Sequence, residues 1–260
     1  MKKFKYIVGL LVLAVLLGVI GVMAFNFFGL GGSAHWKEEV LLHDGTKIIV
    51  KRSQTRGGRG EIGQSPIKSQ TISFTVPGSG KRVVWKDEST KDIGQANFDA
   101  VALHILDKMP YLILHPDKCL SYNKWGRPNP PYIVLKYESD TWRQIPVSDL
   151  PPEFVNINLV ITTSGDEKTL VSKWGVSAEM VKELNRPLKQ DYLQTIIREQ
   201  LKPGSLGVSC EELVHTENNH WLSIDWFSDQ STYEDCLKVC EHKKVIPQNC
   251  PCSRFFNFTR

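Results

Sequence analysis

The feature that most constrains this chain is an apolar stretch near its beginning, residues 6–30, which contains no charged side chain. A helix of this length would extend for about 37 Å, enough to span a hydrocarbon core about 30 Å thick with some tilt. Lys2, Lys3 and Lys5 precede the stretch, whereas Lys37 is the only Lys or Arg in the fifteen residues that follow it. The positive-inside rule therefore predicts a single-pass anchor in the inner or plasma membrane, with a cytoplasmic N-terminus and an exported remainder.

A cleaved signal peptide is the alternative for this stretch. Residues 31–34 read Gly-Gly-Ser-Ala and could serve as a small-residue cleavage site after Ala34. The apolar core of a typical signal peptide is, however, only about 7–15 residues long. Because the run in this chain is longer, we predict that the segment is retained as an anchor.

The overall charge gives little information about partners. The chain of 260 residues has a formal net charge of +4, with Lys and Arg scattered among the acidic residues. This balance offers no basis for binding nucleic acid, and an exported location disfavours it as well. The length that remains after the anchor suffices for one large domain or two smaller ones.

Four successive segments have the alternating pattern of β-hairpins. In the first, residues 38–52, two apolar runs flank Asp44 and Gly45, a dipeptide that suits a tight turn because both residues can take positive φ. The other three segments have their turns at residues 77–80, 107–110 and 138–140. Without a convincing long helix between them, these segments predict an antiparallel meander over residues 31–150, folded as a sandwich or a small barrel, with a propeller left open.

A pair of short motifs raises the possibility of an exported hydrolase. Ser65 and Lys68 fit Ser-x-x-Lys, and Ser121 and Asn123 fit the Ser-x-Asn element found beside it in penicillin-binding proteins and serine β-lactamases. In those enzymes the Ser-Lys pair opens a helix, where the lysine helps to activate the hydroxyl. Here Pro66 follows the serine within a predicted loop, and the chain has no Lys-Thr-Gly or Lys-Ser-Gly. We assign no catalytic residue, and a hydrolase with an unrecognised site stays as an alternative.

The character of the sequence changes at residues 151–208, which we expect to form a smaller α+β segment. The pattern predicts a strand, two short helices around Gly175, a further helix over residues 190–201 and a closing strand. Ser177 is well placed to cap the second of the short helices.

Several short motifs in this segment occur in the order of a known family. They are Gly165-Asp166, Gly-Val-Ser at residues 175–177, Leu184-Asn185, and Pro-Gly-x-Leu at residues 203–206. In this respect residues 159–208 resemble the LysM module, a βααβ unit that binds the N-acetylglucosamine chains of peptidoglycan and chitin. The chain has one residue fewer than the family pattern before Gly175 and several more before Pro203. The resemblance implies a glycan-binding groove formed by Gly165, Asp166, Thr169 and Pro203.

Two other interpretations of the same stretch remain open. A Gly-Val-Ser turn between two helices also fits a helix-turn-helix, but such a protein would need DNA on the exported side of the membrane. Alternatively, the regularly spaced apolar residues are the core face of a helical hairpin that packs on the β-domain. They are Leu170, Trp174, Met180 and Leu184.

The six cysteines all follow the predicted span, and four of them fall within residues 236–252. A zinc cage would suit the Cys-x₃-Cys at Cys236 and Cys240, but the second pair is a tight Cys-x-Cys and thiolate cages are uncommon in oxidising compartments. A redox pair would need Cys-x-x-Cys, which the chain lacks. An even number of cysteines in an exported segment favours disulfides, and we predict no metal and no cofactor.

The pairing of these cysteines cannot be deduced from sequence alone. A capping box that starts at Ser231 or Thr232 predicts a short helix with Cys236 and Cys240 on one face. A plausible scheme joins these two cysteines to Cys250 and Cys252. That scheme leaves Cys119 and Cys210 for a bridge between the two halves of the chain.

The predicted organisation is a cytoplasmic stub (residues 1–5), an anchor (6–30), an antiparallel β-domain (31–150), an α+β segment (151–208) and a disulfide-stapled C-terminal segment (209–260). From it we predict a membrane-anchored, exported protein that serves the cell envelope as a non-enzymatic binding or structural component, on the periplasmic side if bacterial. Besides the membrane, its expected partner is cell-wall glycan or another envelope protein, and nucleic acid is excluded.

Overall fold

The computed structural model describes residues 32–57, 66–162, 170, 175–202 and 210–256. Among them, no helix combines the length and apolar character needed to cross a membrane. The anchor predicted at residues 6–30 lies outside the described residues and stays a prediction.

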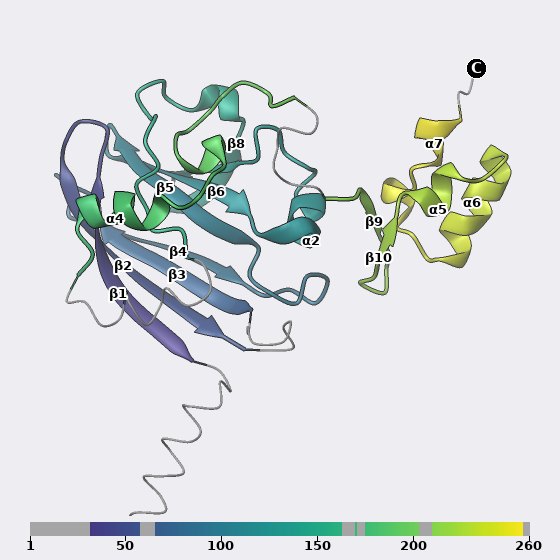
Figure 1. Cartoon of the computed structure of the whole chain (residues 1–260), viewed down its shortest axis with the longest axis horizontal. Coiled ribbons are helices and arrows are strands. Elements are labelled where there is room, and N and C mark those ends of the chain that lie inside the picture. The colour runs from purple at the N-terminus through teal and green to yellow at the C-terminus, as the bar shows by residue number, and fades with distance from the viewer. Residues whose placement is uncertain (1–31, 58–65, 163–169, 171–174, 203–209, 257–260) are drawn as a thin grey trace, which may run out of the picture.

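Two four-stranded antiparallel sheets form the β-domain (Figure 1). In each sheet the strands neighbour one another in chain order, as in a meander. The first sheet consists of β1 (Ser33–Leu41), β2 (Lys47–Arg56), β3 (Ile67–Thr75) and β4 (Arg82–Glu88). The second consists of β5 (Phe98–Leu106), β6 (Met109–Pro116), β7 (Ile133–Glu138) and β8 (Thr141–Ile145). The mainly antiparallel β-fold and the four hairpins predicted from the sequence are therefore confirmed.

The turn at Asp44 differs from the tight two-residue turn that we predicted. Only Gly45 of the pair takes positive φ, at 84°. The loop is closed by a hydrogen bond from the Leu42 amide to the Thr46 carbonyl, and Asp44 accepts a further one from the Thr46 amide at 2.9 Å. Turns in which both central residues have positive φ occur instead at β5–β6 and β7–β8, with Asp107, Lys108, Ser139 and Asp140.

The two sheets share one apolar core. In β1, β2 and β4 every second residue points inward, as the alternation of the sequence requires. The inward side chains of the first sheet meet those of the second at Val40, Val50, Ile72, Phe74, Val83, Trp85, Leu103, Leu112, Leu114 and Ile133. Burial of these side chains is the main stabilising term for the β-domain.

The inward face of the first sheet also includes charged residues. Glu38 and Arg52 are both buried and form an ion pair, with 3.3 Å between Arg52 Nη1 and Glu38 Oε1. Arg52 also donates to the carbonyl oxygen of Val160 at 2.6 Å, and the indole of Trp36 donates to Glu38 at 3.1 Å. This network attaches the segment around Val160 to the sheet and satisfies both buried charges.

Strands β5 and β6 are buried on both faces, because the segment after β8 covers their outer face. This segment includes η1 (Val147–Asp149), η2 (Asp191–Leu193) and α4 (Ala178–Asn185). The apolar side chains that it packs against the sheet are Leu150, Phe154, Ile157, Ile161, Tyr192, Leu193 and Ile196. Burial on two sides explains why the sequences of β5 and β6 are almost continuously apolar.

The prediction of a helix over residues 190–201 is wrong beyond the single turn of η2. The hydroxyl of Tyr132 donates to the carbonyl oxygens of Tyr192 and Thr195, at 2.6 and 3.2 Å, and the Ile196 amide donates to the carbonyl of Val155. Backbone groups that a helix would bond internally are therefore used by Tyr132 of the β-domain and by Val155 of the covering segment. The strand predicted at the start of the segment is reduced to an isolated bridge between Asn156 and Thr195.

Helix α4 begins as predicted, with Ser177 as its N-cap. The hydroxyl oxygen of Ser177 accepts a hydrogen bond from the Met180 amide at 3.3 Å. Val176, just before the cap, forms a parallel bridge with Glu38 of β1. Leu170, Val176 and Val181 then pack with Trp36 and Val160 in a small core cluster at the edge of the first sheet.

The C-terminal part, residues 213–256, forms a compact unit that we call the cystine module. It consists of the hairpin β9 (Leu213–His215) and β10 (Trp221–Ser223), followed by α5 (Asp225–Ser228), α6 (Tyr233–His242), η3 (Pro247–Asn249) and α7 (Cys252–Phe255). Thr232 caps α6 by accepting from the Asp235 amide at 3.1 Å. Disulfides Cys236–Cys252 and Cys240–Cys250 attach this helix to the segment that follows η3. The sequence led us to expect bridges from the helix cysteines to Cys250 and Cys252, and the structure shows which cysteine pairs with which.

Candidate binding cleft between the β-domain and the cystine module

A third disulfide joins the cystine module to the β-domain. Cys119 lies in α2 (Lys118–Lys124), a short helix that follows β6, and Cys210 lies just before β9. The bond Cys119–Cys210 connects residues 91 positions apart in the sequence. The module therefore stands beside α2 rather than on the sheets (Figure 1).

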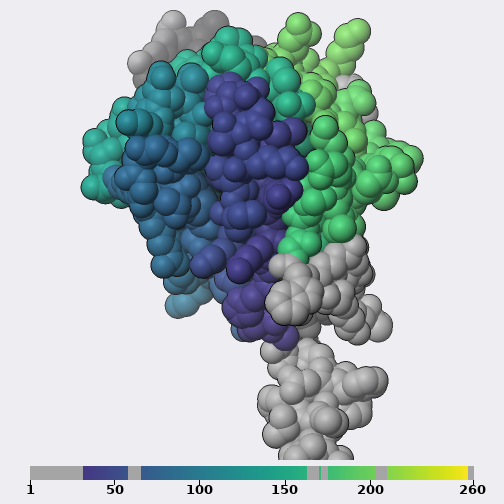
Figure 2. All heavy atoms as spheres, turned by 90° about the vertical axis from the view of Figure 1, so that its left-hand side faces the viewer, coloured from purple at the N-terminus to yellow at the C-terminus, as the bar shows by residue number. Residues whose placement is uncertain are grey.

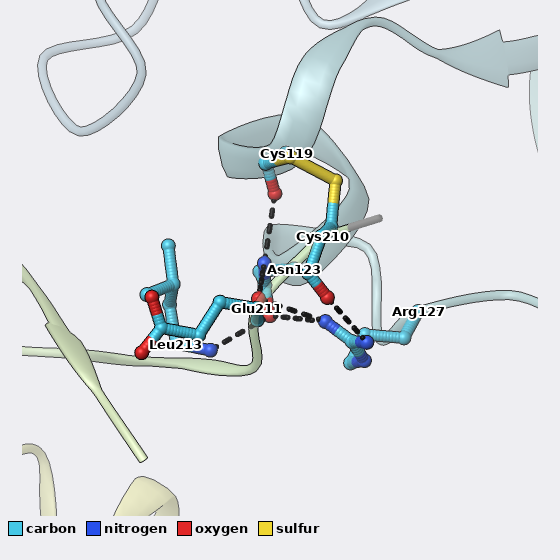
Figure 3. The surroundings of a disulfide bond; sticks show 6 residues. All are labelled: Cys119, Asn123, Arg127, Cys210, Glu211 and Leu213. Atoms are coloured by element: carbon cyan, nitrogen blue, oxygen red, sulfur yellow. Dashed lines mark hydrogen bonds between the residues drawn. A yellow bond between two sulfur atoms is a disulfide. The ribbon is translucent and has the colours of Figure 1, made fainter. Parts of the chain in front are cut away.

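Hydrogen bonds around this disulfide fix the chain that enters the module (Figure 3). The guanidinium of Arg127 donates to the carbonyl oxygens of Cys210 and Glu211 at 2.9 and 3.0 Å. Asn123 donates to the Glu211 carbonyl at 2.9 Å and accepts from the Leu213 amide at the same distance. These bonds hold the backbone by its polar groups on both sides, so the joint resists rotation as well as separation.

A second contact between the two parts lies on β10. The indole nitrogen of Trp221 donates to the carbonyl oxygen of Asp92 at 2.8 Å. Asp92 belongs to the connection between β4 and β5, so this contact involves a different segment of the β-domain from the disulfide. Two separate attachments define the orientation of the module.

A cleft of about 650 Å³ lies between the module and the β-domain. The β-domain contributes Asp92, Asn123 and Lys124 to its lining. The module contributes residues from β9, β10, η3 and α7, among them His215, Trp221, Gln248, Ser253 and Arg254, and Glu212 lines the cleft from the segment that enters the module. The volume falls within the range of small-molecule sites in proteins.

Two ion pairs border the cleft. Lys124 lies 3.0 Å from Asp92 on the β-domain side, and Arg254 lies 3.2 Å from Glu212 on the module side. Partial burial works to raise the pKa of the Asp92 carboxyl, but hydrogen bonds from Thr90 and Lys124 outweigh it and the pKa is lowered. The hydrogen bond from Arg254 likewise lowers the pKa of Glu212. Both carboxylates are therefore charged at neutral pH, and the cleft presents both signs of charge.

An aromatic pair forms part of the wall. The rings of His215 and Trp221 lie 4.7 Å apart between centroids, tilted by 38°. The Nε2 atom of His215 is buried and has no hydrogen-bond partner among the described residues. A buried ring nitrogen without a partner is a group that a bound molecule or water can satisfy.

The glycan-binding residues expected from the LysM resemblance are Gly165, Asp166, Thr169 and Pro203. All four lie outside the described residues, so the resemblance stays a prediction.

The described residues of the Ser-x-x-Lys and Ser-x-Asn motifs do not come together in a substrate site. Ser65 lies outside the described residues, and Lys68 lies on β3 with its side chain exposed. Ser121 is fully buried and its hydroxyl donates to the carbonyl oxygen of Asn97. Asn123 supports the joint to the module instead.

All six cysteines are oxidised in the structure. The sulfur atoms of Cys240, Cys250 and Cys252 lie within 4.8 Å of one another, a spacing that thiolates could use for a metal ion. In disulfide form they are neutral and weak ligands, so their proximity follows from two neighbouring disulfides.

Comparisons of the chain with protein-family models, with curated proteins and with solved structures gave no match. The cleft was not predicted from the sequence. Its walls come from segments more than a hundred residues apart, such as Asp92 and Trp221, and no local pattern marks them as neighbours. The one sequence signal for this arrangement is the bridge expected between Cys119 and Cys210.

Proposed function

We propose that this protein is a membrane-anchored, exported binding protein of the cell envelope, without catalytic activity, and that the cleft beside the cystine module receives a polar segment of another envelope protein. The observation that carries the proposal is the joint around Cys119–Cys210, which fixes the two walls of the cleft. The predicted anchor at residues 6–30 would keep this site close to the membrane.

The rigidity of the joint supports a binding role. A covalent bond, the hydrogen bonds of Arg127 and Asn123, and the Trp221 contact hold the walls in place before any ligand arrives. A site that is already ordered loses less conformational entropy on binding, so more of the contact energy appears as affinity.

The chemistry of the cleft supports a polar protein segment as the ligand. Its lining offers both signs of charge at Lys124 and Glu212, an amide at Gln248 and the indole of Trp221. Trp and Arg are over-represented among the residues that dominate binding energy at protein interfaces, and amides pair readily with a peptide backbone. Two further aromatic side chains of the module, Trp226 and Phe255, are exposed at 50% and 36% outside the lining of the cleft.

Site-specific photo-crosslinking from Gln248 in the full-length chain, followed by mass spectrometry of the membrane fraction, tests this proposal. Gln248 lines the cleft and is exposed. Ser253→Trp, at a second exposed lining position, fills the cleft with a large side chain and is expected to abolish the crosslinked product. Lys189→Trp, at an exposed position outside the lining of the cleft, is the matched control and should leave the product unchanged. Equal crosslinking in both variants would show that the cleft is not the binding site.

A further inference from the structure

The outer face of the first sheet has an excess of positive charge. We call the outward side chains of β1 to β4 the basic face, and Figure 2 shows these strands toward the viewer. Its charged residues are Lys37, Glu39, Lys47, Lys51, Arg82, Lys86 and Glu88. Five cations and two anions therefore share this face, and the local net charge is +3.

The two acidic residues of the basic face are already paired. Glu39 lies 3.2 Å from Lys47, and Glu88 lies 3.1 Å from Lys86. The other three cations, Lys37, Lys51 and Arg82, have no side-chain ion pair or hydrogen bond within the part of the chain that the structure describes.

Two of these unpaired cations, Lys37 and Lys51, are placed where their repulsion destabilises the sheet. Lys37 of β1 lies directly opposite Lys51 of β2 in the antiparallel register, with both side chains exposed on the same face. Like charges in directly opposite positions destabilise a sheet. A local arrangement that costs stability without an evident structural gain is expected at a functional site.

A groove of about 460 Å³ lies among these cations. Its lining includes the side chains of Lys37, Lys51 and Arg82, with hydroxyls from Ser53 and Ser73 between them. Ammonium, guanidinium and hydroxyl groups are all hydrogen-bond donors, and they suit an anion with several oxygens, such as a phosphate group.

Apolar side chains on the same face favour a lipid headgroup over a soluble anion. Ile49 is 52% exposed and Val84 is 43% exposed, and both point outward beside the cations. A mixture of cations and exposed apolar side chains is typical of surfaces that enter the headgroup region of a bilayer. In addition, β1 begins at Ser33, only three residues after the predicted anchor ends, a distance of about 10 Å in extended chain.

We propose that the basic face binds the surface of an anionic membrane, with lipid phosphate groups in the groove among Lys37, Lys51 and Arg82 and with Ile49 and Val84 at the headgroup level. The proposal rests on the membrane anchor of the proposed function. Contact through this face would turn the β-domain against the membrane and leave the cystine module free for its partner.

The test uses the full-length chain in lipid nanodiscs that contain phosphatidylcholine alone or with phosphatidylglycerol. The rate of lysine acylation by a water-soluble reagent is measured at each lysine by peptide mass spectrometry. In the anionic discs, Lys37 and Lys51 should react at least about fivefold more slowly than in phosphatidylcholine discs, because three cations that each strengthen binding by about that factor hold the face at the membrane most of the time. High salt should remove the difference because it shortens the screening length. Lys189 is the internal control, because it is exposed and follows Leu188, which packs on the outer face of the second sheet rather than on the basic face.

The double variant Lys51→Gln with Arg82→Gln removes two of the free cations at exposed positions, so the fold should be retained. In this variant, Lys37 should react equally fast in both kinds of disc. In the unmodified chain, acylation rates of Lys37 and Lys51 that do not differ between the two kinds of disc would overturn the proposal. Inorganic phosphate that slows the acylation of both lysines in phosphatidylcholine discs as much as phosphatidylglycerol does would also overturn it. If the chain does not enter the discs, the anchor is refuted, and the same labelling with added phosphatidylglycerol vesicles tests the basic face alone.

Discussion

The disulfide Cys119–Cys210 is expected to contribute more to stability than either disulfide of the cystine module. It closes a loop over a sequence separation of 91 residues, whereas Cys240–Cys250 closes one of only 10. In the chain-entropy model the contribution grows with the logarithm of loop length, which gives about 4.6 kcal/mol for the long loop and about 2.8 kcal/mol for the short one. Replacing Cys119 and Cys210 together by Ser should lower the free energy of unfolding by the larger amount.

Urea denaturation of the full-length chain in detergent, followed by tryptophan fluorescence, measures this loss. The matched control is the double replacement of Cys240 and Cys250 by Ser, which removes a disulfide that closes a much shorter loop. The free energy of unfolding of the long-loop variant should be lower than that of the control by about 1.8 kcal/mol, the difference between the two values. A loss below about 1 kcal/mol for Cys119→Ser with Cys210→Ser, or a larger loss in the control, would refute the entropic argument for the joint.

Three further predictions address the core and the predicted glycan site. Glu38→Gln should destabilise the protein by about 3–5 kcal/mol, because Arg52 is then buried without its counter-charge. The double variant Glu38→Gln with Arg52→Met should recover much of this loss, and equal urea midpoints in the two variants would contradict the prediction. Burial lowers the pKa of His104 from 6.5 to about 4, so the unfolded chain takes up the proton first as pH falls. Neutral His104 therefore contributes roughly 3 kcal/mol to the free energy of unfolding, fully present above pH 6.5 and lost as the pH falls toward 4. Urea midpoints measured across this range should fall less in His104→Phe than in the unmodified chain. The LysM resemblance predicts that the detergent-solubilised chain sediments with insoluble peptidoglycan and that Asp166→Ala weakens this; sedimentation no greater than that of an unrelated exported protein would remove the glycan hypothesis.

Local patterns predicted the β-domain well because each hairpin is specified within about twenty residues. Alternation places Val40 and Val50 inward, and the turns need only residues that tolerate their φ angles. The caps of α4 and α6 were predictable for the same reason, since Ser177 and Thr232 each bond to an amide three residues later.

Patterns failed where distant segments compete for the same backbone groups. The apolar spacing of residues 190–201 is compatible with a helix, but the hydroxyl of Tyr132 and the carbonyl of Val155 take hydrogen bonds that a helix would need. The alternation also placed Glu38 and Arg52 on the inner face of the sheet, where only their mutual contact and that with Val160 make burial of the two charges tolerable.

The sequence by itself determined the strand order, the hairpins and the even set of cysteines suited to disulfides, because these depend on alternation, turn chemistry and residue count. The tertiary structure decided the cleft and the basic face. The cleft exists because Cys210 and Trp221 are brought to α2 and Asp92 across about a hundred residues. The basic face exists because β1 to β4 pair in chain order and bring Arg82 of β4 to the same face as Lys37 and Lys51, a placement that the register of one hairpin does not fix.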